Sequence, residues 1–198
     1  MRSLLSLVPV LLGAMHLSAP AQPVQPGEKF PWQQLEVRAP ESPGWVLISA
    51  SKQALAFMRR SDELARSEVA TVSVFKLPEP LDRDRFRAWV DQAVQAELPA
   101  SRFRPVEQHA EASDTRGYDC VVHRSVSHDL QARTTQAGSA PPLLQQVALY
   151  CRHPARAGTG FSAAFSTRGA LYDPTLQARA GDFLGSIVAT APASGSAP

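Results

Sequence analysis

The sequence predicts an α+β fold in which one antiparallel sheet of about six to seven strands packs with two amphipathic helices. Three observations support this class. Strand-like segments follow one another in runs joined by short turns, two other segments carry apolar residues at the helical period, and regular strand–helix–strand alternation is missing. Such runs favour antiparallel pairing. The expected order of elements is β-β-β-α-β-β-β-β-α.

The strands before the first helix are marked by β-branched and aromatic residues. A short strand is expected at residues 35–39, followed by turn chemistry (Pro-Glu-Ser-Pro-Gly) at 40–44. Residues 45–51 and 54–60 are β-rich runs separated by a short polar step, as in a hairpin. Residues 69–77 form a third strong strand, which closely spaced prolines end.

Two helices are expected, each with one apolar face. The first begins after Asp82, a residue type that favours the N-cap, and ends before Pro99. Its apolar stripe consists of Phe86, Trp89, Val90, Ala93 and Val94. The second helix is predicted to begin with Asp173 as N-cap and Pro174 at the first helical position. Its stripe consists of Leu176, Ala180, Phe183, Leu184 and Ile187.

Four strands are expected between the helices, at residues 103–111, 118–128, 144–153 and 161–168. The polar segment 129–142 joins the second of these strands to the third. This layout resembles the Mog1/PsbP-like sandwich modules of the DcrB type that occur in periplasmic proteins. The resemblance rests on Pro43-Gly44-Trp45 at the first core strand, a helix after the first hairpins and a C-terminal helix after a meander. It implies an accessory or binding module and supplies no functional residues.

The only two cysteines lie on the strands 118–128 and 144–153. Antiparallel pairing of Cys120 with Cys151 places the midpoint of the hairpin inside the polar loop, so the two side chains can face each other across adjacent strands. In an oxidising compartment these cysteines should form a disulfide. The alternative is a Cys2His2 metal site completed by His123 and His153, but strand alternation puts His123 on the face opposite Cys120.

Both ends of the chain are expected to lie outside the folded domain, which we place at residues 35–190. Residues 1–21 combine Arg2, the apolar run 4–12 and Ala19-Pro20-Ala21, which is typical of a cleaved signal peptide. The alternative is an uncleaved anchor, although the apolar run is short for a membrane span. Residues 22–34 are predicted to be an extended, Pro-rich leader without fixed structure, and residues 191–198 a disordered tail.

Charge and motifs exclude several classes of function. The chain has 20 basic and 18 acidic residues, and removal of Arg2 with the signal leaves a net charge of +1. The arginines are scattered among acids, which disfavours nucleic-acid binding. The sequence contains no P-loop, dinucleotide-binding or serine-hydrolase motif, so no cofactor and no catalytic residue is predicted.

The expected function is therefore a non-catalytic accessory or binding role in a bacterial periplasm or outside the cell. The partner would be an unidentified protein or small molecule of the envelope, and no stable membrane span should remain after cleavage. The alternative is a small metal-binding protein or enzyme that uses the histidines of the central strands. Its candidate residues are His123, His128 and His153, which would have to converge in a cleft beside an acid.

Overall fold

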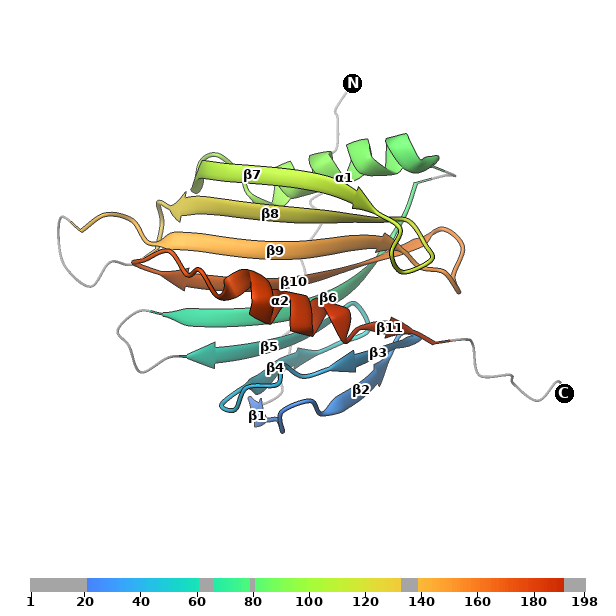
Figure 1. Ribbon diagram of the computed structural model, residues 1–198, viewed down its shortest axis with the longest axis horizontal. Helices are drawn as coiled ribbons and strands as arrows, with labels where there is room; N and C mark the ends of the chain where they lie inside the picture. Colours follow the sequence, from blue (N-terminus) through green and yellow to red (C-terminus); the bar gives the residue numbers. More distant parts are fainter. Residues whose placement is uncertain (1–20, 61–65, 79–80, 133–138, 191–198) are drawn as a thin grey trace, which may run out of the picture.

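The structure is a computed structural model that describes residues 21–60, 66–78, 81–132 and 139–190 (Figure 1). Its centre is an antiparallel sheet of eight strands in the order β1-β4-β5-β6-β10-β9-β8-β7. These strands are β1 (Gln22–Pro23), β4 (Val46–Ala50), β5 (Ala54–Arg60), β6 (Ser67–Lys76), β7 (Phe103–Ser113), β8 (Cys120–Asp129), β9 (Leu143–Arg152) and β10 (Thr159–Gly169). A second sheet has the order β11-β3-β2, with β2 (Lys29–Trp32), β3 (Leu35–Arg38) and β11 (Val188–Ala189).

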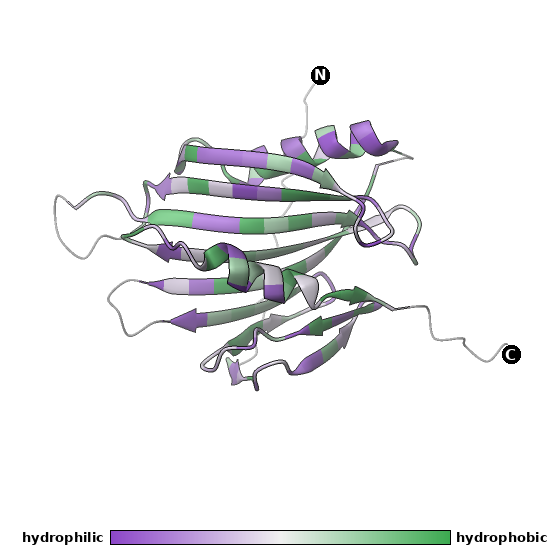
Figure 2. Ribbon diagram, viewed as in Figure 1, coloured by the Kyte–Doolittle hydropathy of each residue, from purple (hydrophilic) through white to green (hydrophobic). Residues whose placement is uncertain are grey.

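The two helices lie on opposite faces of the large sheet. α2 (Leu176–Gly185) packs over β9 and β10 and shares the main core with the small sheet, so we call this side the α2 face. α1 (Arg83–Glu97) packs on the other side, the α1 face, where Phe86, Val90 and Val94 contact Val121 and Tyr150. Successive residues of β8 therefore enter different cores. Figure 2 shows that β7, at the edge, is largely hydrophilic, whereas β9 carries long hydrophobic stretches.

Most of the predicted elements are present. β5 has the predicted bounds, and the four strands between the helices differ from prediction by only a few residues. Asp82 is the N-cap of α1, and its carboxylate accepts a hydrogen bond of 2.8 Å from the amide of Arg85. Cys120 lies directly opposite Cys151 across β8 and β9, which confirms the predicted register.

The number of strands and the structure of residues 22–34 were predicted wrongly. Six strands, not three, precede α1, one more follows α2, and the strands form two sheets. β1 and β2 lie in the segment expected to have no fixed structure. Tertiary contacts outweigh its proline content, since the ring of Phe30 packs 5.3 Å from that of Phe57 and the indole of Trp32 donates a 2.7 Å hydrogen bond to the Ser51 carbonyl. Proline at position 31 is tolerated because β2 is an edge strand.

The start of α2 also differs from the prediction. The helix begins at Leu176 with Thr175 at the N-cap, two residues later than expected, and the Thr175 side chain makes no capping bond. The Asp173 carboxylate instead accepts hydrogen bonds from the Thr175 amide at 3.0 Å and the Thr175 hydroxyl at 2.7 Å. The predicted signal peptide, apart from residue 21, and the predicted tail lie outside the described residues. Among the described helices, none is long and apolar enough to cross a membrane.

Candidate interaction surface

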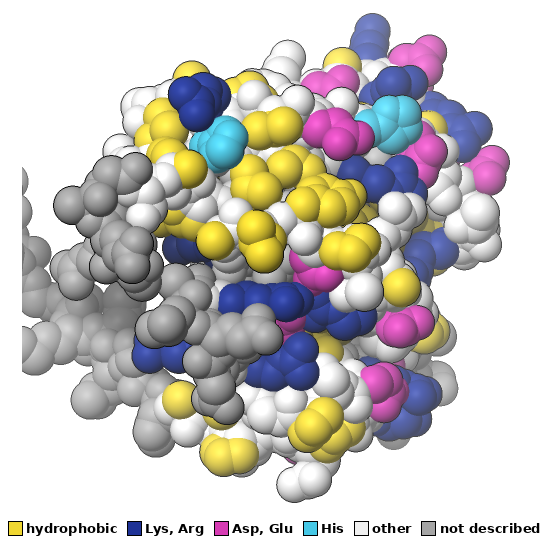
Figure 3. Space-filling model, turned by 60° about the vertical axis from the view of Figure 1, so that its left-hand side comes forward, with side chains coloured by type: hydrophobic (Ala, Val, Ile, Leu, Met, Phe, Trp, Pro, Cys, Tyr) yellow, Lys and Arg dark blue, Asp and Glu magenta, His cyan; other side chains and the backbone are white. Residues whose placement is uncertain are grey.

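One corner of the large sheet carries most of the exposed apolar side chains. Of the five large hydrophobic residues that are exposed in the described chain, four lie where β7 begins and where β8 and β10 end. They are Val106, Leu130, Leu171 and Tyr172, with 59%, 44%, 82% and 63% of their surface exposed, and we call them the apolar corner. Figure 3 looks toward this end and shows a hydrophobic patch with a histidine at each margin and Lys or Arg side chains below it.

The corner is exposed because the layer over the α2 face is incomplete. α2 packs over β9 and β10, and it leaves β7 and the end of β8 uncovered on this side (Figure 1). Val106 falls at a bulge, because the pairing of β7 with β8 shifts register between Pro105 and Glu107. Bulges re-aim side chains at sheet edges, which accounts for the exposure of an apolar residue there.

A buried glutamine fixes the loop that presents Leu171 and Tyr172. The side chain of Gln145 on β9 is only 1% exposed. Its amide nitrogen donates to the Leu171 carbonyl at 3.2 Å, and its oxygen accepts from the Asp173 amide at 2.9 Å. Both polar ends of Gln145 are therefore used by the segment between β10 and α2. This segment is held on the sheet while its apolar side chains point outward.

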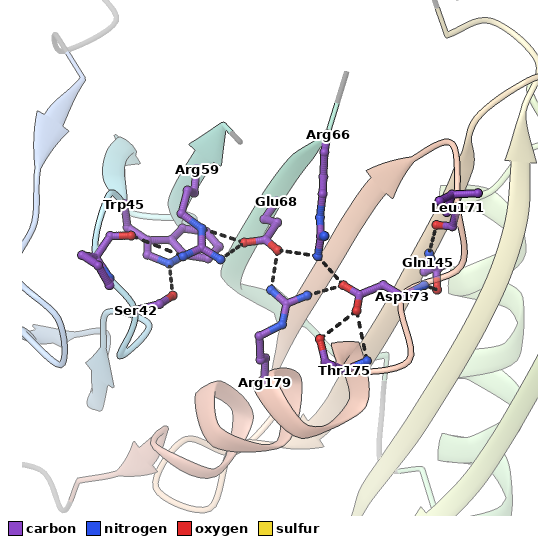
Figure 4. A network of polar contacts seen from close by, with 11 residues as sticks. Ser42, Trp45, Arg59, Arg66, Glu68, Gln145, Leu171, Asp173, Thr175 and Arg179 are labelled. Carbon is purple, nitrogen blue, oxygen red and sulfur yellow. Dashed lines mark hydrogen bonds and ion pairs between the residues drawn. The ribbon is translucent and has the colours of Figure 1, made fainter. Parts of the chain in front are cut away.

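A network of arginines and carboxylates holds the same loop from the other side (Figure 4). Glu68 on β6 is 3% exposed and accepts from Arg59 at 2.8 Å, and also from Arg66 and Arg179. Asp173 accepts from Arg66 at 2.5 Å and from Arg179. The network thus joins β5, β6, the β10–α2 loop and α2.

The charges in this network are unequal in number, with three guanidinium groups around two carboxylates. Burial disfavours the ionised form of Asp173. Hydrogen bonds from Thr175 and the charges of Arg179 and Arg66 outweigh this effect, so the pKa of Asp173 is below its usual value. The carboxylate of Asp173 is therefore ionised at neutral pH. One positive charge remains in excess beside Leu171 and Tyr172.

A second, smaller cluster of the same composition lies at the end of β8. Asp129 is fully buried and accepts two hydrogen bonds of 3.1 Å from Arg102, while Arg168 approaches the same carboxylate to 2.9 Å. Burial opposes ionisation here too, and the hydrogen bonds and charges of Arg102 and Arg168 nevertheless lower the pKa of Asp129. Two arginines around one carboxylate again leave one positive charge in excess.

The cavity described at the apolar corner is small. A cavity of about 110 Å³ lies between the β10–α2 loop and β8, lined among others by Arg124, Val126, Tyr172, Pro174 and Gln177. This volume is far below the few hundred Å³ that drug-sized ligands require. The corner is therefore suited to contact a surface rather than to enclose a small molecule.

The disulfide predicted from the sequence is present, at the other end of β8 from the apolar corner. Cys120 and Cys151 are bonded, with their Cα atoms 4.1 Å apart, and both are buried in the main core on the α2 face. The described residues contain no group of three or more His, Cys, Asp or Glu arranged to hold a metal ion. The cysteines therefore act as a covalent link between two central strands.

The candidate histidines occupy three separate places. His123 is buried on the α1 face beside Asp91 and His109, and its ring makes no hydrogen bond to a described residue. His128 lies at the margin of the apolar corner, where its Nδ1 is 3.2 Å from the Pro141 carbonyl. The candidate histidines lie on both faces of the sheet. They therefore do not converge in the cleft that a metal-binding or enzymatic function would need.

His153 is held as a neutral ring at the end of β9. Its Nδ1 accepts a 3.2 Å hydrogen bond from the Ala155 amide, so the proton is on Nε2, which donates to the Gln33 carbonyl at 3.2 Å. Burial lowers the pKa of His153, with a further contribution from the charge of Arg156, and burial also lowers the pKa of His123. Both rings therefore favour the neutral form in these positions.

The lowered histidine pKa values predict that the protein loses stability as the pH falls from 7 to 5. The unfolded chain has the ordinary histidine pKa of about 6.5, so below that pH it binds more protons than the folded chain does. Stability from His123 and His153 is therefore complete above pH 6.5 and declines as the pH falls toward the folded values. Urea unfolding at several pH values should show this slope, and a His123→Gln/His153→Gln variant should have a flatter profile. An unchanged profile in the variant would contradict the assignment.

The fold and the corner together define an α+β protein with a disulfide-linked sheet and an exposed apolar surface bordered by arginines. No family model and no curated protein sequence matches the chain. Structures of Mog1 proteins are among the solved structures that are similar to it. A mutant of protein Mog1 is 11% identical, with a TM-score of 0.47, over 87% of this chain and 97% of that chain. The Ran-binding protein Mog1p of Saccharomyces cerevisiae is 10% identical, with a TM-score of 0.45, over 80% of this chain and 91% of that chain.

These similarities agree with the Mog1-like layout that the order of elements indicated. They concern the arrangement of strands and helices alone, and nothing about the partner of this chain follows from them. The apolar corner and the residues that hold it are the features of this chain that point to a function.

Proposed function

We propose that the chain is an exported, non-catalytic binding protein of the bacterial envelope that engages its partner through the apolar corner. The observation that carries the proposal is the exposure of Leu171 and Tyr172 on a loop that Gln145 and Asp173 hold in place. Exposed apolar patches on soluble proteins mark interaction sites. Preorganised side chains lose less conformational entropy on binding, so a fixed loop is suited to this role.

Three features support export. Residues 1–21 have the pattern of a signal peptide, and the disulfide needs an oxidising compartment to persist. β1 begins at Gln22, which would be the first residue after cleavage. Mass spectrometry of the protein from a periplasmic extract should give a chain that begins near Gln22 with both thiols oxidised. An unprocessed chain with free thiols, confined to the cytoplasm, would contradict the proposal.

Binding through the corner can be tested by retention on envelope material. The wild-type chain, a Leu171→Asp/Tyr172→Asp variant and a Val188→Asp control are expressed with an affinity tag and recovered from detergent-free envelope extracts. Val188 is a matched control because it is also an exposed apolar residue but lies on the small sheet. We expect the wild type and the control to retain envelope components that the double variant loses. Equal recovery with all three would contradict a role for the corner.

A further inference from the structure

We infer that the apolar corner docks on an anionic phospholipid surface, with Leu171 and Tyr172 entering the lipid interface and the surrounding arginines contacting the headgroups. The inference rests on the proposed function, because it names the partner of the same surface. Three observations carry it: the charge at this end of the sheet, the exposure of the apolar side chains of the corner, and the distribution of the arginines.

The described residues at this end of the sheet carry an excess of positive charge. The arginines near the ends of β5, β8 and β10 and the starts of β6, β7 and α2 are Arg59, Arg60, Arg66, Arg102, Arg104, Arg168 and Arg179. The carboxylates among them are Glu68, Glu107, Asp129 and Asp173, and Glu41, in the loop before β4, lines the same cavity as Arg179. Among the described residues, seven cations against five anions leave an excess of two positive charges. Arg104 is exposed, pairs with none of the described carboxylates and lies opposite His128 on β8.

The shape of the corner favours a fluid partner. Leu171 and Tyr172 are largely exposed, and the cavity at their base holds only about 110 Å³. A folded protein partner would need pockets complementary to both side chains, whereas a lipid interface accepts protruding apolar groups without preformed pockets. Tyrosine is favoured at the boundary between headgroups and hydrocarbon, because its ring is apolar and its hydroxyl polar.

The arginines are spread over the end of the sheet and do not converge on one point. Arg102 and Arg168 meet at Asp129, while Arg59, Arg66 and Arg179 meet at Glu68 and Asp173. Their stems are fixed by these buried carboxylates, and their side chains remain 25% to 40% exposed. A spread of fixed, partly neutralised cations matches many separate headgroups better than a single acidic side chain.

Vesicle flotation tests the inference directly. The protein purified from the periplasm is mixed with vesicles of phosphatidylglycerol and phosphatidylcholine in equal parts, or of phosphatidylcholine alone. We expect binding to the anionic vesicles and little to the neutral ones. Replacing Leu171 and Tyr172 with aspartate should weaken binding by about tenfold or more, because the apolar transfer is lost. Arg104→Gln should weaken it about fivefold, the typical effect of one arginine near an anionic surface, and raised salt should act in the same direction.

The Val188→Asp variant serves as the control and should bind as the wild type does. All variants are compared by thermal unfolding, so that loss of binding is not confused with loss of structure. Two results would overturn the lipid inference: no binding of the wild type to either kind of vesicle, or equal binding by the wild type and the corner variants. If vesicles are not bound but the corner variants lose an envelope protein that the wild type retains, the lipid inference fails while the proposed function stands.

Discussion

Replacing Glu68 with glutamine is expected to lower the free energy of unfolding by about 3 to 5 kcal/mol, the typical effect of removing one partner from a buried ion pair. Glu68 is almost fully buried and accepts hydrogen bonds from three arginines on three different segments. Without its charge, Arg59 loses its carboxylate partner and Arg179 keeps only Asp173. The carboxylate of Asp173 cannot replace it for Arg59, because it contacts only Arg66 and Arg179. Urea unfolding of the wild type and the variant at pH 7 measures the difference.

Glu107→Gln provides the matched control for this experiment. Glu107 is an exposed glutamate on β7 that forms no ion pair with a described residue, so its replacement should change stability by no more than about 0.5 kcal/mol. If Glu68→Gln were as mild as Glu107→Gln, the network would not be what holds β5, β6 and α2 together at this end of the sheet.

Removing the disulfide is expected to have a similar effect by a different mechanism. Cys120 and Cys151 are 31 residues apart, and closing a loop of this length restricts the unfolded chain by about 3 to 4 kcal/mol in the chain-entropy model. The double variant Cys120→Ser/Cys151→Ser should therefore unfold at a clearly lower urea concentration. The buried serine hydroxyls add a smaller penalty where they find no hydrogen-bond partner.

A reducing agent separates these two contributions. Dithiothreitol should destabilise the wild type by nearly the amount that the double variant loses and should leave the double variant unchanged. A wild type that unfolds at the same urea concentration with and without dithiothreitol would show that the bond contributes little to stability.

The strands and the first helix were predictable because local patterns agree with the tertiary structure. In β8 every second residue faces the same core, so Cys120 and Val121 enter different clusters, as the alternation indicated. The midpoint of the loop between the two cysteines predicted the register of β8 and β9. The structure has this register, with Cys120 opposite Cys151. α1 begins at its predicted cap because the Asp82 side chain bonds the first turn of its own helix.

The remaining elements depend on contacts between distant segments. β1 and β11 have two residues each and exist only because β4 and β3 pair with them. β2 is stabilised by Phe30 and Trp32 against distant residues, a source of order that its proline-rich composition does not reveal. α2 starts later than predicted because Asp173 binds Arg66 and Arg179 as well as the Thr175 amide and hydroxyl.

The candidate site was harder to predict than the fold. His123, His128 and His153 were candidate site residues because imidazoles can bind metals or act as acids and bases. In the structure they lie apart, because they occupy different faces or different ends of the strands. The apolar corner combines a residue near the start of β7 with residues of the loops that follow β8 and β10, whose proximity follows from the strand order β10-β9-β8-β7. One local signal was available: Leu171 and Tyr172 are large apolar residues that follow a strand-ending glycine and precede the Asp173-Pro174 turn. Gln145 gave no such signal, since an isolated glutamine within a strand carries no indication of its partners.

Contact of Leu171 and Tyr172 with a partner in the cell can be tested by photo-crosslinking. The photoreactive amino acid benzoylphenylalanine is placed at position 172 or, as the control, at position 188, and whole cells are irradiated. We predict that position 172 gives crosslinked products with lipid or protein of the envelope and that position 188 does not. An exported, folded protein that gives no product at position 172, or the same products at both positions, would contradict the claim.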